Sequence, residues 1–169
     1  MDWLNILMKA SAKIKKVVHL LEPIYDEQSK VLILGSFPSV ISRKDMMYYA
    51  NKTNRFWSVM GALFEEEITD HVSFCHKHHL AMWDVIHSCT IEGSSDSSIK
   101  NVIPNDIAGL VQKTHIELIV TTGKKAAALY EQYIHLDLPH ISLPSTSAAN
   151  AKMRLDELVY EYRKIKEVL

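Results

Sequence analysis

The feature that most constrains the fold of this chain is a regular alternation of apolar runs with amphipathic segments. Residues 31–34 form a continuous apolar run that stops at Gly35, which is typical of a strand covered on both faces. Further strands are expected over 80–86, 116–122 and 140–145. Helical spacing of apolar residues predicts helices over 54–64, 103–112, 124–133 and 148–169. This order predicts an α/β fold of three layers, α/β/α, around a central, mainly parallel four-stranded sheet.

The composition favours one domain. The chain has 169 residues with only five Gly and five Pro, and no repeat or low-complexity linker divides it. We therefore expect a single domain over 21–169. Residues 1–20 are expected to form an N-terminal helical extension or a loose arm, since their lysines follow the apolar segment, the reverse of a secretory signal. No apolar run reaches the roughly 18 residues that span a bilayer, so no membrane contact is expected.

Charge and cysteine content exclude several classes of protein. The formal net charge is -1, so a polyanionic partner must be met by a local basic patch. Two cysteines, Cys75 and Cys89, cannot supply a disulfide framework, and reduced thiols predict a cytoplasmic protein. The histidines of residues 71–79 do not have the spacing of a zinc finger or a zinc hydrolase, so we expect no metal.

The carboxyl ends of the predicted strands are where a ligand would bind in such a sheet. Ser36, Phe37, Pro38 and Ser39 follow the first strand, and Asp84 lies at the end of the second. The turn 121–123 and the segment 143–150 follow the third and fourth strands. The first turn has neither a dinucleotide fingerprint nor a phosphate loop, which disfavours a nucleotide-hydrolysing enzyme.

Two turns rich in hydroxyl groups would meet at that edge. Free amides and hydroxyls in the turns after the first and fourth strands can hold phosphates, and together they could grip one nucleic-acid strand. Capping of the following helices is the alternative for Ser36 and Ser39. Cations that follow these turns either collect on the same edge or are solvated helix faces: Arg43, Lys44, Lys52, Arg55, Lys124, Lys125, Lys152 and Arg154.

Aromatic and carboxamide side chains cluster in "MMYYANKTNRFWSVM". Aromatic faces stack on extruded bases, and a carboxamide can contact a base edge or position a water. For Phe56 and Trp57 the core is favoured, because they begin an amphipathic helix, whereas Asn54 is open between a helix cap and a pocket amide. Asp84 could hold a neighbouring loop or act on a water, and loop 92–101 is either a plain connection or a lid.

Several of these segments, in order, resemble one known family. "LILGSFPSVISR", "YYANKTNRFW", "WDVIHSCTIEGSSDSSIKN", "GKKA" and "LPSTSAANA" are similar to the hypoxanthine-DNA glycosylase (DNA-deoxyinosine glycosylase) branch of the uracil-DNA glycosylase superfamily. The resemblance runs from about Pro23 to the final helix. It implies an enzyme that flips a deaminated base out of DNA and hydrolyses its bond to deoxyribose.

The resemblance also implies roles for individual residues. Phe37 stands where the uracil enzymes carry an Asp or Asn that handles water, and Leu143 stands where they carry a His, which leaves Asn54 as the expected catalytic residue. The base is expected to meet Ser36, Phe37, Tyr49, Asp84 and Asn150. The DNA backbone is expected to meet Ser39, Arg43, Lys124, Ser145, Thr146 and Ser147.

The implied reaction needs no cofactor and no covalent nucleophile, so we expect base removal without strand cleavage. The expected partner is double-stranded DNA containing a deaminated base, bound by a monomer without an obligate protein partner. Three alternatives stay open: a glycosylase for uracil or mismatched thymine, a catalytically inactive DNA-binding module of the same fold, and a binder of small nucleotides.

Overall fold

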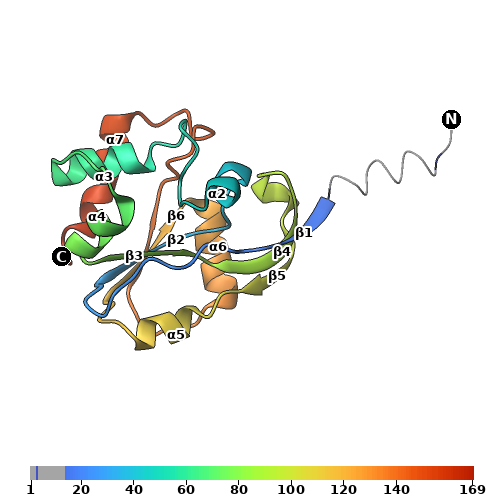
Figure 1. The fold of residues 1–169 in the computed structure, drawn as a ribbon, viewed down its shortest axis with the longest axis horizontal. Coiled ribbons are helices and arrows are strands. Elements are labelled where there is room, and N and C mark those ends of the chain that lie inside the picture. The colour runs from blue at the N-terminus through green and yellow to red at the C-terminus, as the bar shows by residue number, and fades with distance from the viewer. Residues whose placement is uncertain (1–2, 4–13) are drawn as a thin grey trace.

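Four parallel strands form the centre of the protein (Figure 1). The structure is a computed structural model that describes residue 3 and residues 14–169. Every neighbouring pair in this sheet is parallel, in the order β3-β2-β6-β7. The prediction of an α/β fold with a central four-stranded sheet is therefore confirmed. The strands are β2 (Val31–Gly35), β3 (Leu80–Asp84), β6 (Leu118–Thr122) and β7 (His140–Leu143).

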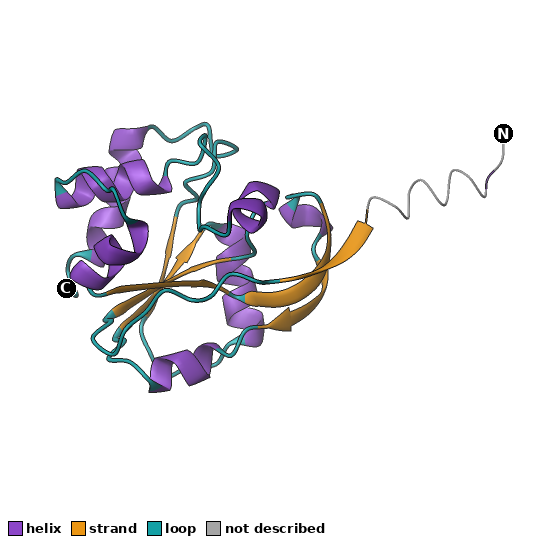
Figure 2. Cartoon of the chain, viewed as in Figure 1, coloured by secondary structure: helices purple, strands orange, loops and turns teal. Residues whose placement is uncertain are grey.

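Side chains that alternate along β2 divide the core into two layers. Val31 and Ile33 pack into one cluster with α3 (Phe56–Phe64), α4 (His71–Lys77) and α7 (Leu155–Tyr162). Leu32 and Leu34 pack into the other with α5 (Ile107–Gln112) and α6 (Lys124–Tyr133). Figure 2 shows helices on both sides of the strands, which is the expected three-layer arrangement. All four side chains of the strand are buried, as the unbroken apolar run predicts.

A second, antiparallel sheet was not predicted. It consists of β1 (Ile14–Val18), β4 (Ile86–Glu92) and β5 (Lys100–Pro104), in the order β1-β4-β5. Residues 14–18 are therefore a strand rather than part of a helical extension or loose arm. β1 pairs with β4 far along the chain, and local periodicity carries no trace of such a distant partner. Residues 1–2 and 4–13 of the predicted extension lie outside the described residues.

Three predicted boundaries are also corrected. Residues 103–104 belong to β5, and α5 begins only after Asp106, whose side chain accepts a hydrogen bond from the Gly109 N–H. The predicted strand 80–86 is interrupted, since β3 ends at Asp84 and β4 begins at Ile86. The last helix begins at Leu155, not at residue 148, and a 3₁₀ turn follows it over Arg163–Ile165.

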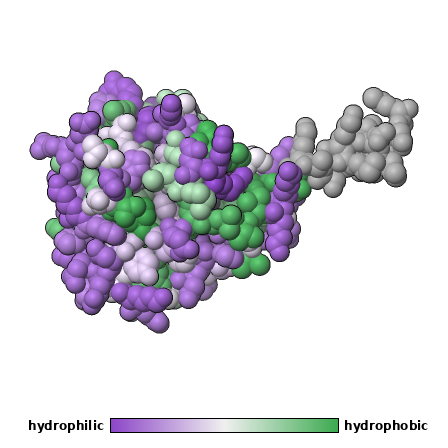
Figure 3. Space-filling view, in the orientation of Figure 1, coloured by the Kyte–Doolittle hydropathy of each residue, from purple (hydrophilic) through white to green (hydrophobic). Residues whose placement is uncertain are grey.

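The surface is mostly hydrophilic in the view of Figure 3, with apolar residues gathered over the second sheet. In that sheet Ile14, Val18 and Ile103 are exposed. Among the described residues, no helix has the length and apolar character needed to cross a membrane. The division of the chain at residue 20 stays a prediction.

The order of the strands creates a crevice between β2 and β6. The chain leaves β2 through α3 and α4, on one face, to reach β3. It leaves β6 through α6, on the opposite face, to reach β7. Where successive connections depart to opposite sides, a gap opens beyond the carboxyl ends of the strands, and this is where ligands bind in such sheets.

Candidate functional site

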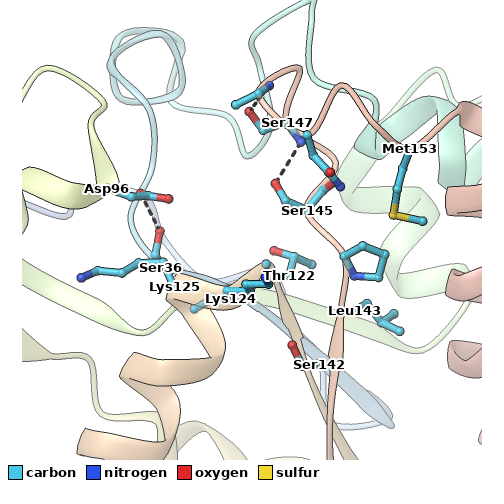
Figure 4. Close-up of a pocket in the computed structure, with 15 residues that line it drawn as sticks. Ser36, Asp96, Thr122, Lys124, Lys125, Ser142, Leu143, Ser145, Ser147 and Met153 are labelled. Atoms are coloured by element: carbon cyan, nitrogen blue, oxygen red, sulfur yellow. Dashed lines mark hydrogen bonds between the residues drawn. The ribbon is translucent and has the colours of Figure 1, made fainter.

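Two adjoining cavities lie at the carboxyl edge of the central sheet. The Asn54 cavity, of about 240 Å³, is lined by the turn after β2, by residues 48–54 and by the loop after β7. The Lys124 cavity, of about 670 Å³, lies over the start of α6 (Figure 4). Ser39 and Ser145 both line the Asn54 cavity, so the two hydroxyl-bearing turns meet. The residues common to both cavities are Ser36, Asp96, Thr122, Ser145 and Ser147.

The turn after β2 is held by internal hydrogen bonds. Ser39 caps α2 (Val40–Asp45), and its Oγ accepts a hydrogen bond of 3.1 Å from the backbone N–H three residues later. The Arg43 guanidinium donates to the carbonyls of Pro38, at 3.1 Å, and Gly93, at 3.2 Å. It also lies 5.3 Å from the centre of the Phe37 ring, which lines the Asn54 cavity. Binding of the DNA backbone by Ser39 and Arg43 stays a prediction.

The Asn54 carboxamide lines its cavity, and among the described residues only its oxygen has hydrogen-bond partners. Its Oδ1 accepts hydrogen bonds from the Phe56 N–H, at 2.9 Å, and from the Thr146 hydroxyl, at 2.8 Å. Asn54 precedes the N-cap of α3, Arg55, and its Oδ1 binds the first N–H of the helix while the residue lines the cavity, so it combines both roles that the sequence left open. With both lone pairs of Oδ1 in use, only the Nδ2 hydrogens remain for a ligand.

The position of Thr146 differs from its expected one against the DNA backbone. The residue is 1% exposed, and its hydroxyl is directed to Asn54. Its carbonyl accepts a hydrogen bond of 3.0 Å from the Arg55 N–H. Burial therefore makes Thr146 a residue that orients the Asn54 carboxamide.

Hydroxyls in the turn after β7 keep their protons available. Ser145 Oγ accepts from the Ser147 N–H at 3.1 Å, and Ser147 Oγ accepts from the Ala149 N–H at 3.2 Å. Asn150 Nδ2 donates to the Ser145 carbonyl at 2.9 Å. Figure 4 shows Ser145 and Ser147 on the same loop beside the cavity. Since each hydroxyl oxygen is an acceptor within the loop, each O–H is free to donate to a phosphate.

Arg55 binds the backbone of this loop, so its guanidinium is not free to bind a ligand. Its guanidinium donates to the carbonyls of Ser147, at 3.1 Å, and Asn150, at 3.0 Å, and also to that of Met153. Because these carbonyls bind the guanidinium, they are not available to accept the backbone hydrogen bonds of a helix. The last helix therefore begins only at Leu155. The sequence analysis grouped Arg55 with cations that either face a polyanion or are solvated, and in the structure its guanidinium binds the loop instead.

Replacing Arg55 by Lys is expected to lower the free energy of unfolding by about 1.5–3 kcal/mol, because an ammonium cannot bind three separated carbonyls as a guanidinium does. Urea denaturation measures this loss, and the rate of base excision should fall with it. Lys44→Arg, an exchange on the exposed face of α2, is the control. Full stability of the Arg55→Lys protein would mean that positive charge alone is required.

Aromatic residues divide between core and cavity. Phe56 is fully buried, in agreement with the core alternative, and stacks on Tyr49 at 4.1 Å between ring centres. The Tyr49 hydroxyl lies 2.9 Å from Thr122 Oγ1, and both residues line the Asn54 cavity. Burial, and secondarily the charge of Asp84, raises the pKa of Tyr49, so the phenol stays neutral. Tyr49 can therefore offer a hydrogen bond as well as a ring face.

Asp84 lies behind the first turn and lines neither cavity, contrary to the expected contact with the base. It is 5% exposed, and its Oδ2 lies 2.7 Å from Nε2 of His19. A Cβ on Gly35 would approach Asp84 Oδ1 to 2.5 Å, so only glycine lets the strand pass this carboxylate. The structural alternative for Asp84 applies. Its partner His19 was missed, because it falls in the segment predicted to be an extension.

Basic residues are fewer at the site than the sequence indicated. Lys124 and Lys125 line the Lys124 cavity at the first turn of α6. They follow Gly123, whose φ of 91° brings α6 close to Ser145. The other predicted cations line neither cavity: Arg43, Lys44, Lys52, Arg55, Lys152 and Arg154.

The histidine-rich segment has structural partners. His71 stacks on Trp57 at 3.9 Å between ring centres, and His78 hydrogen-bonds with Glu66. Across the part of the chain that the structure describes, no group of three or more His, Cys, Asp or Glu side chains could hold a metal ion.

Asp96 is a second residue that the sequence did not single out. It belongs to the 3₁₀ turn Asp96–Ser98 between β4 and β5, and it lines both cavities. The only signal was the composition of loop 92–101, which was left as a connection or a lid. Its side chain accepts a hydrogen bond of 3.3 Å from the Ser36 hydroxyl.

Comparisons with known proteins show the family to which the chain is similar. A family model described as the uracil DNA glycosylase superfamily matches residues 22–165. A protein of Methanosarcina acetivorans named hypoxanthine DNA glycosylase is 33% identical over 76% of this chain and 85% of its own. One of the same name from Methanosarcina barkeri is 28% identical over 62% and 70%. A solution NMR structure from Methanosarcina acetivorans, proposed to be a uracil DNA glycosylase, superposes with a TM-score of 0.74 at 31% identity, over 90% of this chain and 99% of that one.

Proposed function

Because this chain belongs to the uracil DNA glycosylase superfamily, we propose that it is a DNA glycosylase that removes hypoxanthine from DNA. The two relatives named for that base support hypoxanthine as the substrate. The enzyme would flip the damaged nucleotide into the Asn54 cavity and hydrolyse the bond between base and sugar. No cofactor and no metal take part in this proposal.

The observation that carries the proposal is the arrangement around Asn54. A carboxamide fixed by Phe56 and Thr146 shares one cavity with the Phe37 ring and with Tyr49. The cavity opens beside Ser145 and Ser147, whose hydroxyls are free to bind phosphate. Such a site can stack a flipped base on aromatic rings while the serine hydroxyls outside the cavity bind the phosphates of the DNA backbone.

The chemistry matches the groups that are present. Cleavage of the N-glycosidic bond passes through a cation-like sugar, so a positioned water needs little activation. Asn54 Nδ2 donates to the oxygen of this water and leaves its second lone pair directed at the sugar. A phenyl ring at position 37 cannot do this, which is why the role passes to Asn54.

We extend the proposal to the mode of DNA binding. Ser145 and Ser147 would bind phosphates on one side of the flipped nucleotide, and Lys124 would bind the backbone across the adjoining cavity. Ser39, Arg43 and Asn150 would support the two turns. Double-stranded DNA as substrate, a monomeric enzyme and a cytoplasmic location belong to the same proposal.

The test is a set of duplexes that carry one deoxyinosine, deoxyuridine, deoxyxanthosine or mismatched thymine each. We expect abasic sites, revealed as strand breaks after alkali, in the deoxyinosine duplex, and no breaks before alkali. Faster release of uracil or thymine would assign the enzyme to that base instead. Intact duplexes throughout, at enzyme concentrations that saturate DNA binding, would leave a DNA-binding module without activity.

A further inference from the structure

The two carboxamides that line the Asn54 cavity have no acceptor left for a ligand. Asn54 Oδ1 is bound by Phe56 and Thr146. The other carboxamide, that of Asn51, has its Oδ1 bound by the N–H of Thr53 at 3.0 Å and by the Thr53 hydroxyl at 2.8 Å. Both amides therefore offer donors to a ligand, and neither offers an acceptor.

Asp96 supplies a charged acceptor, which the hydroxyls and carboxamides of the cavity do not. Ser36 donates to its Oδ1 at 3.3 Å, and no hydrogen bond from the described residues reaches its Oδ2. Among the described residues that line either cavity, it is the only carboxylate. In Figure 4 it faces Ser36 at the border that the two cavities share.

A carboxylate at this place requires an explanation, because the proposed substrate, DNA, is itself a polyanion. Asp96 repels the phosphates that Ser145, Ser147 and Lys124 would bind. It is not there to cap a long helix, since its 3₁₀ turn spans only three residues. A direct contact with the base offsets this repulsion.

We propose that the Asp96 carboxylate accepts a hydrogen bond from the N1–H of the flipped hypoxanthine and so selects it against adenine. The inference rests on the proposed function. Hypoxanthine carries a donor at N1 and an acceptor at O6, whereas adenine carries an acceptor at N1 and a donor at its amino group. Adenine would set its N1 lone pair against a carboxylate oxygen, and no proton could join them.

The pH dependence follows from the state of this carboxylate. Although the residue as a whole is exposed, desolvation of the carboxyl raises its pKa; the Ser36 hydroxyl and the charge of Lys125 oppose this shift. The ionised form is the stronger acceptor, and protonation weakens it and adds a donor, so this preference is lost as pH falls through the raised pKa. Excision of hypoxanthine should then decline at a higher pH than an ordinary aspartate would produce.

The experiment compares wild-type enzyme with Asp96→Asn, which keeps the shape and removes the charge. The binding probes are two duplexes with 2′-fluoro sugars, which resist cleavage, one carrying hypoxanthine and one adenine. We expect the ratio of dissociation constants, adenine over hypoxanthine, to fall roughly 10- to 100-fold in the variant. The single-turnover rate on ordinary deoxyinosine DNA should fall by a similar factor, and the acid limb of its pH profile should disappear.

Asp137→Asn, which removes the same charge from an exposed site outside both cavities, is the matched control. An unchanged ratio in Asp96→Asn, or an equal change for both bases, would overturn the inference. That outcome is distinct from failure of the proposed function, which would appear as intact deoxyinosine DNA with the wild-type enzyme itself.

Discussion

Replacing Asn54 by alanine should slow the single-turnover excision of hypoxanthine about 10²- to 10³-fold, the usual loss when one preorganised donor is removed from a reaction site. The affinity for DNA should change little, because the expected phosphate contacts come from Ser145, Ser147 and Lys124. Rate and affinity are measured separately, by quenched single-turnover assays and by fluorescence anisotropy.

Stability must be followed in the same variant, since Asn54 Oδ1 also accepts the first backbone N–H of α3. Loss of such a hydrogen bond costs about 0.5–1.5 kcal/mol, so the assays belong at temperatures well below the unfolding transition. Asn51→Ala is the control, because it removes a carboxamide from the same cavity and leaves the Thr146 contact intact. If the Asn54→Ala enzyme works at a rate close to that of the wild type, the water must be held by another group.

Replacing His19 by alanine should lower the free energy of unfolding by about 3–5 kcal/mol, the cost of leaving one partner of a buried pair alone. His19 and Asp84 are 6% and 5% exposed, so water cannot replace the lost contact. Chemical denaturation measures the change. His135→Ala, at an exposed position, controls for the loss of a histidine as such.

A double-mutant cycle sharpens this second prediction. If the contact of 2.7 Å is what stabilises the fold, His19→Ala combined with Asp84→Ala should cost less than the sum of the two single changes. Strictly additive losses would show that each residue acts through packing alone. Since the His19 ring also meets the Phe37 ring edge-on, with 6.0 Å between ring centres, base excision should be measured in both single variants.

The central sheet could be predicted because its signal is local. The apolar run of β2 is buried on both faces, and the carboxyl ends of parallel strands must share an edge, so the meeting of Ser39 and Ser145 followed from fold class alone. The antiparallel sheet could not be predicted. β1 is an edge strand whose side chains are mostly exposed, so its sequence lacks the alternation of apolar and polar residues that predicts a strand.

The sequence by itself determined the α/β architecture, the edge at which the site lies and the family to which the chain belongs. Only the tertiary structure decided which polar side chains face the cavities. Asn54 and Thr146 are 92 residues apart, His19 and Asp84 are 65, and Ser36 and Asp96 are 60. A side chain whose polar atoms are all bonded to such a distant, buried partner cannot bind a ligand. A side chain that uses only part of its polar atoms in this way can still bind a ligand with the rest. Because neither outcome leaves a trace in local spacing, Asp84 and Thr146 were expected at the ligand, while His19 and Asp96 were passed over.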